Sequence, residues 1–303
     1  MGQGQGDRLC LVHNPKAGRR SSQRQLDQLR RRFGDQLEVR GTTGPGAASD
    51  MARTAVEEGF AGVVAMGGDG TVHETATGLL DANRLNVPLI VCPAGSANDY
   101  AHSLLREFGE SVRWPRIMTA VDVGRVHGLS SRPAWFVNSL GLGFSARVTL
   151  ESRRIRWLRG AWLYGLAALR AMTRHFDCHE WRVGIDGQPA ERRPVLMLSL
   201  LIGRREGNFL LAPHARMADG EFDFAIAGRL RRWDVIRLLP ALALAGPPAG
   251  YRELSTGRCH SLEIEAPLPI AAHVDGEILA RPEDDRHSAR VELIPGRLPV
   301  SVL

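Results

Sequence analysis

The sequence predicts an α/β domain built on a parallel sheet, followed by a mainly antiparallel β domain. Up to about residue 105, short apolar runs alternate with segments of helical spacing, which requires crossover connections between parallel strands. From Thr119 onward, strand-like runs follow one another with few helices between them. We therefore expect domains at 1–124 and 125–288, with 289–303 completing the first domain.

Four strands, each followed by a helix, are expected in the first domain. Apolar spacing defines each helix, and a glycine such as Gly34 or Gly59 ends it. The predicted strands are Arg8–His13, Leu37–Val39, Gly62–Met66 and Pro88–Cys92, and the predicted helices are Ser21–Phe33, Ala48–Glu58, Val72–Leu80 and Asn98–Leu105.

The second domain is expected to consist of strands, interrupted by helices at Ile155–Phe176 and Trp233–Ala245. The last segment contains two further apolar runs, Val291–Ile294 and Leu298–Leu303. The predicted strands before it are Val121–Val126, Trp135–Leu140, Trp181–Ile185, Val195–Ile202, Phe222–Ala227, Leu262–Ile264 and Ile270–Val274.

The composition is that of an ordinary globular protein, with 44% apolar and 24% charged residues. No uncharged apolar run reaches the ~18–20 residues of a membrane-spanning helix, and residues 1–7 lack a signal-peptide pattern. We therefore expect a cytoplasmic protein. The net charge of +6 is too small to indicate a nucleic-acid partner. The four cysteines form no C-x-x-C pair, so we expect them to be structural.

The sharpest local motif is Gly67-Gly68-Asp69-Gly70-Thr71, where an apolar strand meets the start of a helix. Glycines allow positive φ and let the main chain approach a ligand closely. The free N–H groups and the dipole of a helix N-terminus favour an anion such as phosphate. The alternative is a tight turn without a ligand. A P-loop is excluded because no Gly-Lys-Ser/Thr follows.

Two other turns also follow predicted strands, at residues 14–18 and 93–99. In a parallel sheet all three turns lie at the carboxyl edge, where α/β proteins bind ligands. Together they predict a cradle for nucleotide phosphates.

These motifs resemble those of the diacylglycerol-kinase-type lipid kinases, which include sphingosine kinases and bacterial soluble diacylglycerol kinases. The resemblance runs from residue 14 to residue 277, and the ordered set is far more specific than the glycine motif alone. One departure is Ser96, where bacterial members often carry Thr. The matching motifs are Asn14-Pro15-x-Ala17-Gly18, Gly67-Gly68-Asp69-Gly70-Thr71-x-x-Glu74, Pro93-x-Gly95-Ser96-x-Asn98-Asp99, Val121-Asp122-Val123-Gly124, Asn138-x-x-Gly141-x-Gly143-Phe144 and Asp275-Gly276-Glu277.

The resemblance implies a Rossmann-like nucleotide domain and a β-sandwich lipid-substrate domain, with the active site in the cleft between them. It implies transfer of the γ-phosphate of ATP, with Mg²⁺, to a lipid hydroxyl, with diacylglycerol as the expected acceptor and phosphatidic acid as the product. The nucleotide-binding residues it implies are Asn14, Pro15, Lys16, Thr42, Gly67, Gly68, Asp69, Gly70, Thr71, Gly95 and Ser96.

Acidic residues are expected to carry the chemistry, because phosphoryl transfer needs a group that orients and deprotonates the attacking hydroxyl. By resemblance, Asp275 is the candidate general base and Glu277 a partner in the metal–water network; Asp69 is the rival base. The alternative for Asp275-Gly276 is a plain hairpin turn.

Three other aspartates are candidate magnesium ligands by the same resemblance. Asp122 and Asp99 match positions near the magnesium–water network, and Asp219 matches a ligand of a structural magnesium ion. Magnesium prefers oxygen ligands and keeps several waters, so one carboxylate with carbonyl groups would suffice at Asp219. A plain turn is the alternative there.

Other interpretations remain open. Gly141–Ala146 fits G-x-G-x-x-A, but no acid follows at 161–166, so we interpret it as a glycine-rich strand crossing. An NAD kinase shares the glycine motif but usually shows an Asn-Glu pair where this chain has residues 93–99. A catalytically silent lipid-binding protein is the third possibility, and the intact acidic set disfavours it.

The stretch Glu151–Arg174 combines arginines with tryptophans, which suits either an anionic membrane surface or a surface helix with an apolar core face. The expected partners are ATP, a lipid alcohol and, peripherally, an anionic membrane. A homodimer is possible, and no nucleic acid is expected.

Overall fold

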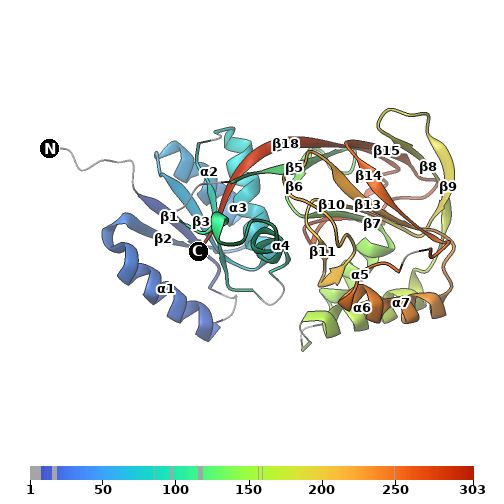
Figure 1. Ribbon diagram of the computed structural model, residues 1–303, viewed down its shortest axis with the longest axis horizontal. Coiled ribbons are helices and arrows are strands. Elements are labelled where there is room, and N and C mark those ends of the chain that lie inside the picture. Colours follow the sequence, from blue (N-terminus) through green and yellow to red (C-terminus); the bar gives the residue numbers. More distant parts are fainter. Residues whose placement is uncertain are drawn as a thin grey trace. The chain divides into compact units, whose positions relative to one another are not determined.

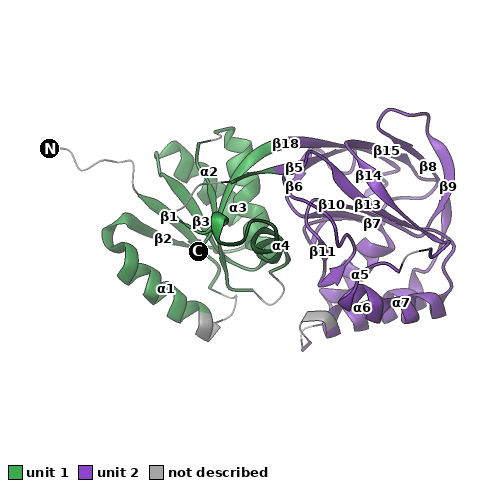
Figure 2. Ribbon diagram, in the orientation of Figure 1, with its two compact units in different colours: residues 1–121, 296–303 green, residues 122–295 purple. Residues whose placement is uncertain are grey.

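The structure is a computed structural model that describes residues 8–15, 19–84, 86–95, 98–114, 119–155, 157–158, 160–248 and 250–303 (Figure 1). It contains two compact units (Figure 2). Unit 1 comprises Met1–Val121 and Gly296–Leu303, and unit 2 comprises Asp122–Pro295. The sequence-based limits were Gly124 and Ala289. The second observed limit falls inside strand β18 (Ser288–Val302), which contributes residues to both units.

Unit 1 contains a parallel sheet with the strand order β2-β1-β3-β4-β18. Strands β1 and β3 are buried along their whole length, as expected for central strands covered on both faces. The predicted parallel α/β domain is confirmed. Its strands are β1 (Leu9–His13), β2 (Leu37–Gly41), β3 (Gly62–Gly67), β4 (Leu89–Pro93) and the end of β18.

The helices of unit 1 cover both faces of this sheet (Figure 1). Leu26 and Leu29 of α1 pack with Leu11 and Met66 in one core cluster. Helices α2 and α3 pack so closely that a Cβ on Gly78 would lie 2.2 Å from the carbonyl oxygen of Ser49. The helices are α1 (Arg19–Phe33), α2 (Ala47–Glu57), α3 (Asp69–Ala82) and α4 (Asp99–Phe108), with 3₁₀ turns at Gly34–Gln36 and Gly109–Val112.

Unit 2 is built mainly from antiparallel strands in two sheets. One sheet has the order β14-β13-β10-β7-β16-β17, that is Leu254–Cys259, Phe222–Ala227, Met197–Leu201, Ser139–Gly143, Ala272–Val274 and Glu277–Ala280. The other sheet contains β5 (Thr119–His127), β6 (Ala134–Phe136), β8 (His179–Ile185), β9 (Glu191–Val195), β15 (Ser261–Glu265) and the start of β18. A short hairpin, β11 (Arg205–Glu206) and β12 (Phe209–Leu210), stands apart, and a 3₁₀ turn covers Pro282–Asp284.

An aromatic stack joins the two sheets of unit 2. The rings of Phe136 in β6 and Phe222 in β13 stack with centroids 5.5 Å apart. Gly124 lies opposite Phe136 in the β5–β6 pair, and a Cβ there would lie 2.0 Å from the Phe136 ring. The glycine therefore leaves the space that this ring fills, and the expected β-sandwich is confirmed.

Helix α5 (Phe144–Ser152) was not predicted. Its buried residues include Ser145, Thr149 and Glu151, so its inward face shows no apolar periodicity. The interpretation of Gly141–Ala146 as a strand crossing is therefore wrong. Strand β7 ends there and α5 begins, with Gly143 at φ +70°.

Other limits also differ from the predictions. Trp135–Leu140 and Val195–Ile202 each divide between two strands. The helix expected at Ile155–Phe176 is α6 (Gly160–Arg174), and that at Trp233–Ala245 is α7 (Arg232–Leu244). The apolar runs Val291–Ile294 and Leu298–Leu303 belong to one strand, because β18 continues between them with Gly296 at φ +55°. Within the described residues, none of the helices is long and apolar enough to cross a membrane.

Thiol reactivity tests the burial of the cysteines. Burial raises the pKa of Cys10 and Cys92 to about 11 and that of Cys259 to about 12, whereas Cys178 is only half-buried. Because the thiolate is the reactive form, we expect iodoacetamide at pH 8 to modify Cys178 first and the other three only after unfolding. Peptide mass mapping over time measures this. Modification of Cys92 in the folded protein at the rate of a free cysteine would contradict it.

Candidate functional site

The carboxyl ends of the parallel strands in unit 1 meet at one edge of the sheet. The amide of Asn14 donates to the carbonyl of Met66 at 3.1 Å, and that of Thr42 donates to His13 at 2.9 Å. The amide of Ala94 donates to Gly67 at 2.9 Å. The structure thus brings Asn14, Thr42, the Gly67–Thr71 motif and Gly95 together, while Pro15 is exposed and Lys16 and Ser96 lie outside the described residues.

The glycines at this edge allow a close approach of two main chains. A Cβ on Gly95 would lie 2.5 Å from the Cα of Gly68, and one on Gly67 would lie 2.3 Å from Thr71 Oγ1. None of Gly67, Gly68 and Gly95 has a positive φ, so of the two properties of glycine considered above, close approach of the main chain is the one used here. Gly95 is needed because a side chain there would separate the two turns, and Gly67 is needed because a side chain there would collide with Thr71.

Helix α3 begins directly at this contact. Its N-cap is Gly68, which has no side chain to satisfy the leading N–H groups of the helix. The amides of Thr71 and Val72 both donate to the carbonyl of Gly68. An uncapped helix N-terminus beside a glycine turn has the geometry and the dipole to bind an anion such as phosphate.

The second turn is held by Asn98, which the motif contained but to which we had assigned no role. Its side chain accepts the N–H of Gly95 and donates to the carbonyl of Gly95, both at 3.0 Å. Asp69, the first residue of α3, accepts the N–H of Tyr100 in α4 at 3.3 Å. Asp69 and the buried Asp99 thus place negative charge at two helix N-termini, where the helix dipole favours it.

In unit 2, Asp275 and Gly276 form the turn between β16 and β17. Their φ values of +50° and +83° are those of a two-residue type I′ hairpin turn. The hairpin alternative therefore describes the backbone here. The buried Asp275 carboxylate accepts the N–H groups of Val137, Asn138 and Ser139 at 2.9, 2.8 and 2.9 Å. Asp275 thus fastens this hairpin to the segment between β6 and β7.

A buried polar network, which the sequence did not reveal, supports the same hairpin. His273 Nδ1 accepts the N–H of Gly276 at 3.3 Å, while its Nε2 lies 3.0 Å from Ser145 Oγ and 3.2 Å from Glu206 Oε1. A Cβ on Gly141 would lie 2.2 Å from Nε2, so the glycine makes room for the ring.

This network is not a nucleophilic triad, because hydroxyl and carboxylate meet the same ring nitrogen instead of opposite ones. Burial alone would raise the pKa of Glu206, but the neighbouring His273 and hydrogen bonds to the carboxylate lower it below its usual value. The network therefore holds a carboxylate against the His273 ring beneath the turn.

Glu277 differs from its neighbour Asp275 in being well exposed. It forms an ion pair with Arg153 at 2.5 Å, and Arg153 also donates to the carbonyl of Gly276 at 3.0 Å. The first arginine of the stretch expected to face a membrane is therefore directed to this hairpin.

Two of the expected metal ligands converge on the turn at Gly220. Asp122 is buried and accepts the N–H of Gly220 at 2.8 Å, and its own N–H donates to Met217. Asp219 Oδ2 is buried without a hydrogen-bond partner and lies 3.4 Å from Arg258 Nη1. Within the described part of the chain, no group of three or more His, Cys, Asp or Glu side chains is arranged to hold a metal ion. Asp99 belongs to unit 1.

Comparisons with known proteins agree with this geometry. Residues 8–126 match the family model of the diacylglycerol kinase catalytic domain. Residues 138–302 match that of the YegS C-terminal NAD kinase beta sandwich-like domain. This chain belongs to the bacterial diacylglycerol-kinase-type family. It is a lipid kinase of that family, and the resemblance inferred from the motifs is confirmed.

Similar proteins cover nearly the whole lipid kinase. A diacylglycerol kinase of Bacillus subtilis is 25% identical over 89% of both chains. A probable lipid kinase YegS-like of Xanthomonas euvesicatoria is 30% identical over 88% of this chain and 87% of its own. The solved structure of a putative diacylglycerol kinase from Bacillus anthracis has a TM-score of 0.72 at 19% identity, covering 98% of this chain and 97% of its own, which shows the common fold.

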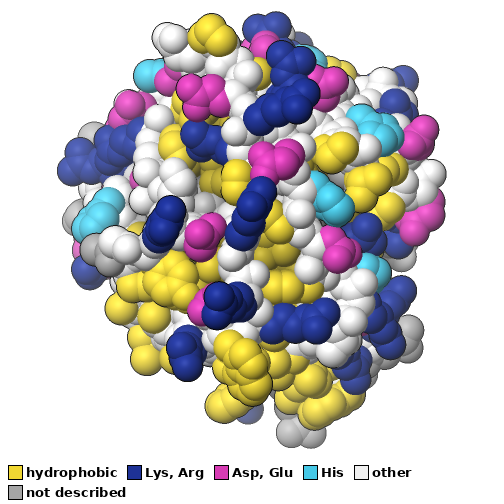
Figure 3. All heavy atoms as spheres, turned by 90° about the vertical axis from the view of Figure 1, so that its right-hand side faces the viewer, with side chains coloured by type: hydrophobic (Ala, Val, Ile, Leu, Met, Phe, Trp, Pro, Cys, Tyr) yellow, Lys and Arg dark blue, Asp and Glu magenta, His cyan; other side chains and the backbone are white. Residues whose placement is uncertain are grey.

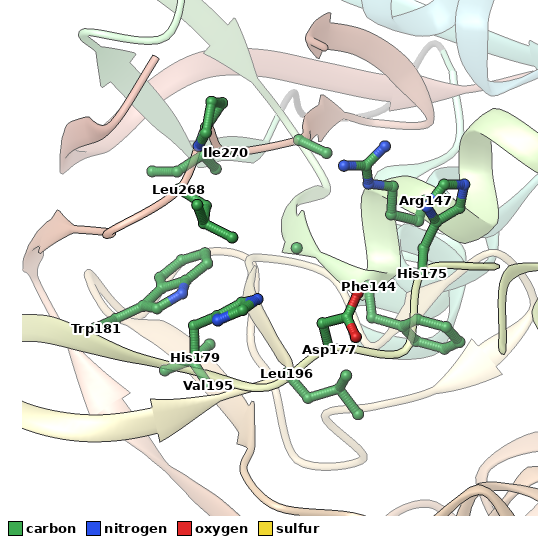
Figure 4. A pocket seen from close by; sticks show the side chains of 13 residues that line it. Phe144, Arg147, His175, Asp177, His179, Trp181, Val195, Leu196, Leu268 and Ile270 are labelled. Carbon is green, nitrogen blue, oxygen red and sulfur yellow. The ribbon is translucent and has the colours of Figure 1, made fainter. Parts of the chain in front are cut away.

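Unit 2 also contains a cavity whose lining includes none of the predicted site residues (Figure 4). Its volume is about 120 Å³, and its lining includes Phe144, Arg147, His175, Trp181 and Leu268. Lipid and drug-sized ligands need pockets of about 300–1,000 Å³. The cavity is too small for such a ligand and lacks the predicted site residues, so it is not the lipid-acceptor pocket.

Gly95→Ala tests the main-chain contact in the lipid kinase. The new Cβ would force apart the Gly68 and Gly95 turns, so we expect the free energy of unfolding to fall by about 1–3 kcal/mol. Urea denaturation measures the loss. Gly44→Ala is the matched control, because Gly44 has open space around it and no positive φ. Equal stability of the two variants would contradict the proposed constraint.

Asp275→Asn tests the role of the carboxylate in the hairpin. An asparagine would turn an NH₂ group toward one of three backbone N–H donors, so we expect a loss of about 1–3 kcal/mol in unfolding free energy. The control Glu277→Gln removes only an exposed ion pair and should cost less than about 1 kcal/mol. If Asp275→Asn unfolds at the wild-type urea concentration, the carboxylate does not anchor the turn.

Proposed function

We propose that this lipid kinase transfers the γ-phosphate of ATP, with Mg²⁺, to the hydroxyl of diacylglycerol and produces phosphatidic acid at the surface of an anionic membrane. The observation that carries the proposal is the uncapped start of helix α3 at the contact of two glycine turns. The name and full-length similarity of the Bacillus subtilis diacylglycerol kinase support the acceptor.

The residues at the edge of the unit 1 sheet fit a nucleotide triphosphate. Backbone N–H groups at the start of α3 supply donors without a competing side-chain cap, and the glycines leave the main chain accessible. Asn14 and Thr42, half-buried at the same edge, supply polar side chains beside these donors. In this proposal they hold the phosphates and the ribose side of ATP.

The carboxylates fit a magnesium ion. The buried Asp219 Oδ2 lacks a hydrogen-bond partner, and Asp122 lies at the same turn, so these two would hold a structural ion. Asp69 and Asp99 offer oxygen ligands in unit 1, where the phosphates are proposed to bind. When bound, magnesium would neutralise the charge of the phosphates.

The transfer itself requires one proton acceptor. The acceptor oxygen bonds to the γ-phosphorus, the bond to the bridging oxygen breaks, and ADP leaves with that electron pair. The hydroxyl proton passes to a carboxylate, for which Asp275 and Asp69 are the two candidates. Asp275 accepts three backbone N–H groups, whereas Asp69 accepts the N–H of Tyr100 at 3.3 Å and is half-buried.

A kinase assay tests the proposal. Purified protein with diacylglycerol in mixed micelles, Mg²⁺ and γ-labelled ATP should give labelled phosphatidic acid, and EDTA should abolish the product. The variants Asp275→Asn and Asp69→Asn are compared at equal folded fraction. The variant that removes the base should lower kcat by about 100-fold or more, and the other variant should lower kcat less. Failure to label any lipid alcohol would refute the proposed reaction.

The second candidate is an NAD kinase, because unit 2 matches a domain described as NAD kinase beta sandwich-like. Replacing the lipid by NAD in the same assay separates the two. Label in NADP and none in lipid would favour this candidate.

A further inference from the structure

Exposed large hydrophobic side chains of the protein gather on two helices of unit 2. Among the described residues, Trp162 of α6 is 82% exposed, and Trp233 and Leu244 of α7 are 71% and 84% exposed. Leu169 and Ile236 are also exposed, and Trp157, just before α6, is 72% exposed. A solvent-facing helix surface normally carries polar side chains, so this arrangement calls for an apolar partner.

The spacing places these side chains on one outward face of each helix. Trp162 and Leu169 are seven residues apart in α6, and Trp233, Ile236, Pro240 and Leu244 follow the i, i+3, i+7, i+11 pattern in α7. Inward residues of both helices, Met172 and Val235, share one core cluster with Phe144. The two outward faces therefore point away from one common core, and Figure 1 shows α6 and α7 next to each other in unit 2. The face of the molecule in Figure 3 carries hydrophobic side chains beside basic ones.

The charges of these helices favour an anionic partner. Helix α6 has no acidic residue and carries Arg170 and Arg174; α7 carries Arg232 and Arg237 against Asp234. Asp234 is engaged at the helix start, where it accepts the N–H of Arg231 at 2.8 Å. Arg174 shares the buried Glu151 with Arg154, whereas Arg170 and Arg237 have no ion-pair partner in the described part of the chain.

We infer that the outward face of α6 and α7 docks this lipid kinase on an anionic bilayer. Tryptophan rings settle at the level of the lipid headgroups, and leucine and isoleucine enter the acyl region below them. Each arginine near an anionic surface adds an electrostatic attraction, which salt weakens. The choice of a membrane as occupant rests on the lipid acceptor, because a lipid kinase must reach a substrate that resides in a bilayer.

Vesicle sedimentation without nucleotide tests the inference. We expect the protein to bind vesicles of equal phosphatidylglycerol and phosphatidylcholine more tightly than vesicles of phosphatidylcholine alone. Trp162→Ser with Trp233→Ser should lower binding to the anionic vesicles by about tenfold or more. Arg170→Gln with Arg237→Gln should reduce the preference for anionic lipid. The control Leu268→Ser alters an exposed hydrophobic residue outside both helices and should bind as wild type.

The outcomes separate this inference from the proposed reaction. Unchanged circular dichroism and unchanged turnover of monomeric short-chain diacylglycerol by the tryptophan variant would show that only docking is lost. The inference is overturned if the wild-type protein does not bind anionic vesicles, or if the tryptophan variant binds them as tightly as the wild type does. Either result counts whether or not the kinase assay succeeds. A concentration-dependent dimer that the tryptophan variant abolishes would assign the face to a second copy of the chain and also overturn it.

Discussion

The contact between the glycine turns after β3 and β4 is the constraint on which the nucleotide side of this protein depends. The two main chains approach so closely that a Cβ on Gly95 would lie 2.5 Å from the Cα of Gly68, so position 95 has to be a glycine. This contact sets the start of α3 beside the start of α4, and the Asn98 side chain and the Asp69–Tyr100 hydrogen bond hold that arrangement. The leading amides of α3 are left without a side-chain cap as a result.

In unit 2 an acidic turn is held on the sheet by hydrogen bonds from two groups of residues. The Asp275-Gly276 hairpin is fastened from above by three backbone amides and from below by His273, whose ring lies against Ser145 and Glu206. Buried polar groups are costly unless each finds a partner, so this network also fixes where β7, β16 and α5 meet. Position 141 has to be a glycine because the His273 imidazole occupies the space that a side chain would need.

The same unit presents an outward apolar face on α6 and α7, while the inward faces of these helices complete a core cluster with Phe144 and Leu196. A helix that is apolar on both sides is stable in water only if its inner face is well packed. The lipid kinase thus combines a polar, hydrogen-bonded edge in unit 1 with an exposed hydrophobic surface in unit 2.

The alternation of strands and helices in unit 1 and the three turns at its sheet edge could be predicted from the amino-acid sequence, because hydrophobic period and glycine position are local properties. The motif set was also sufficient to identify the family. The remaining features depend on contacts between distant segments. Helix α5 could not be predicted because its buried face carries the polar residues Ser145, Thr149 and Glu151, and Ser145 finds its partners in the distant Glu206 and His273. The Asp275 anchor likewise joins segments more than a hundred residues apart. The exposure of Trp162 and Trp233 likewise depends on which face of each helix packs on the core. The sequence alone does not distinguish an apolar side chain that faces the core from one that faces the solvent.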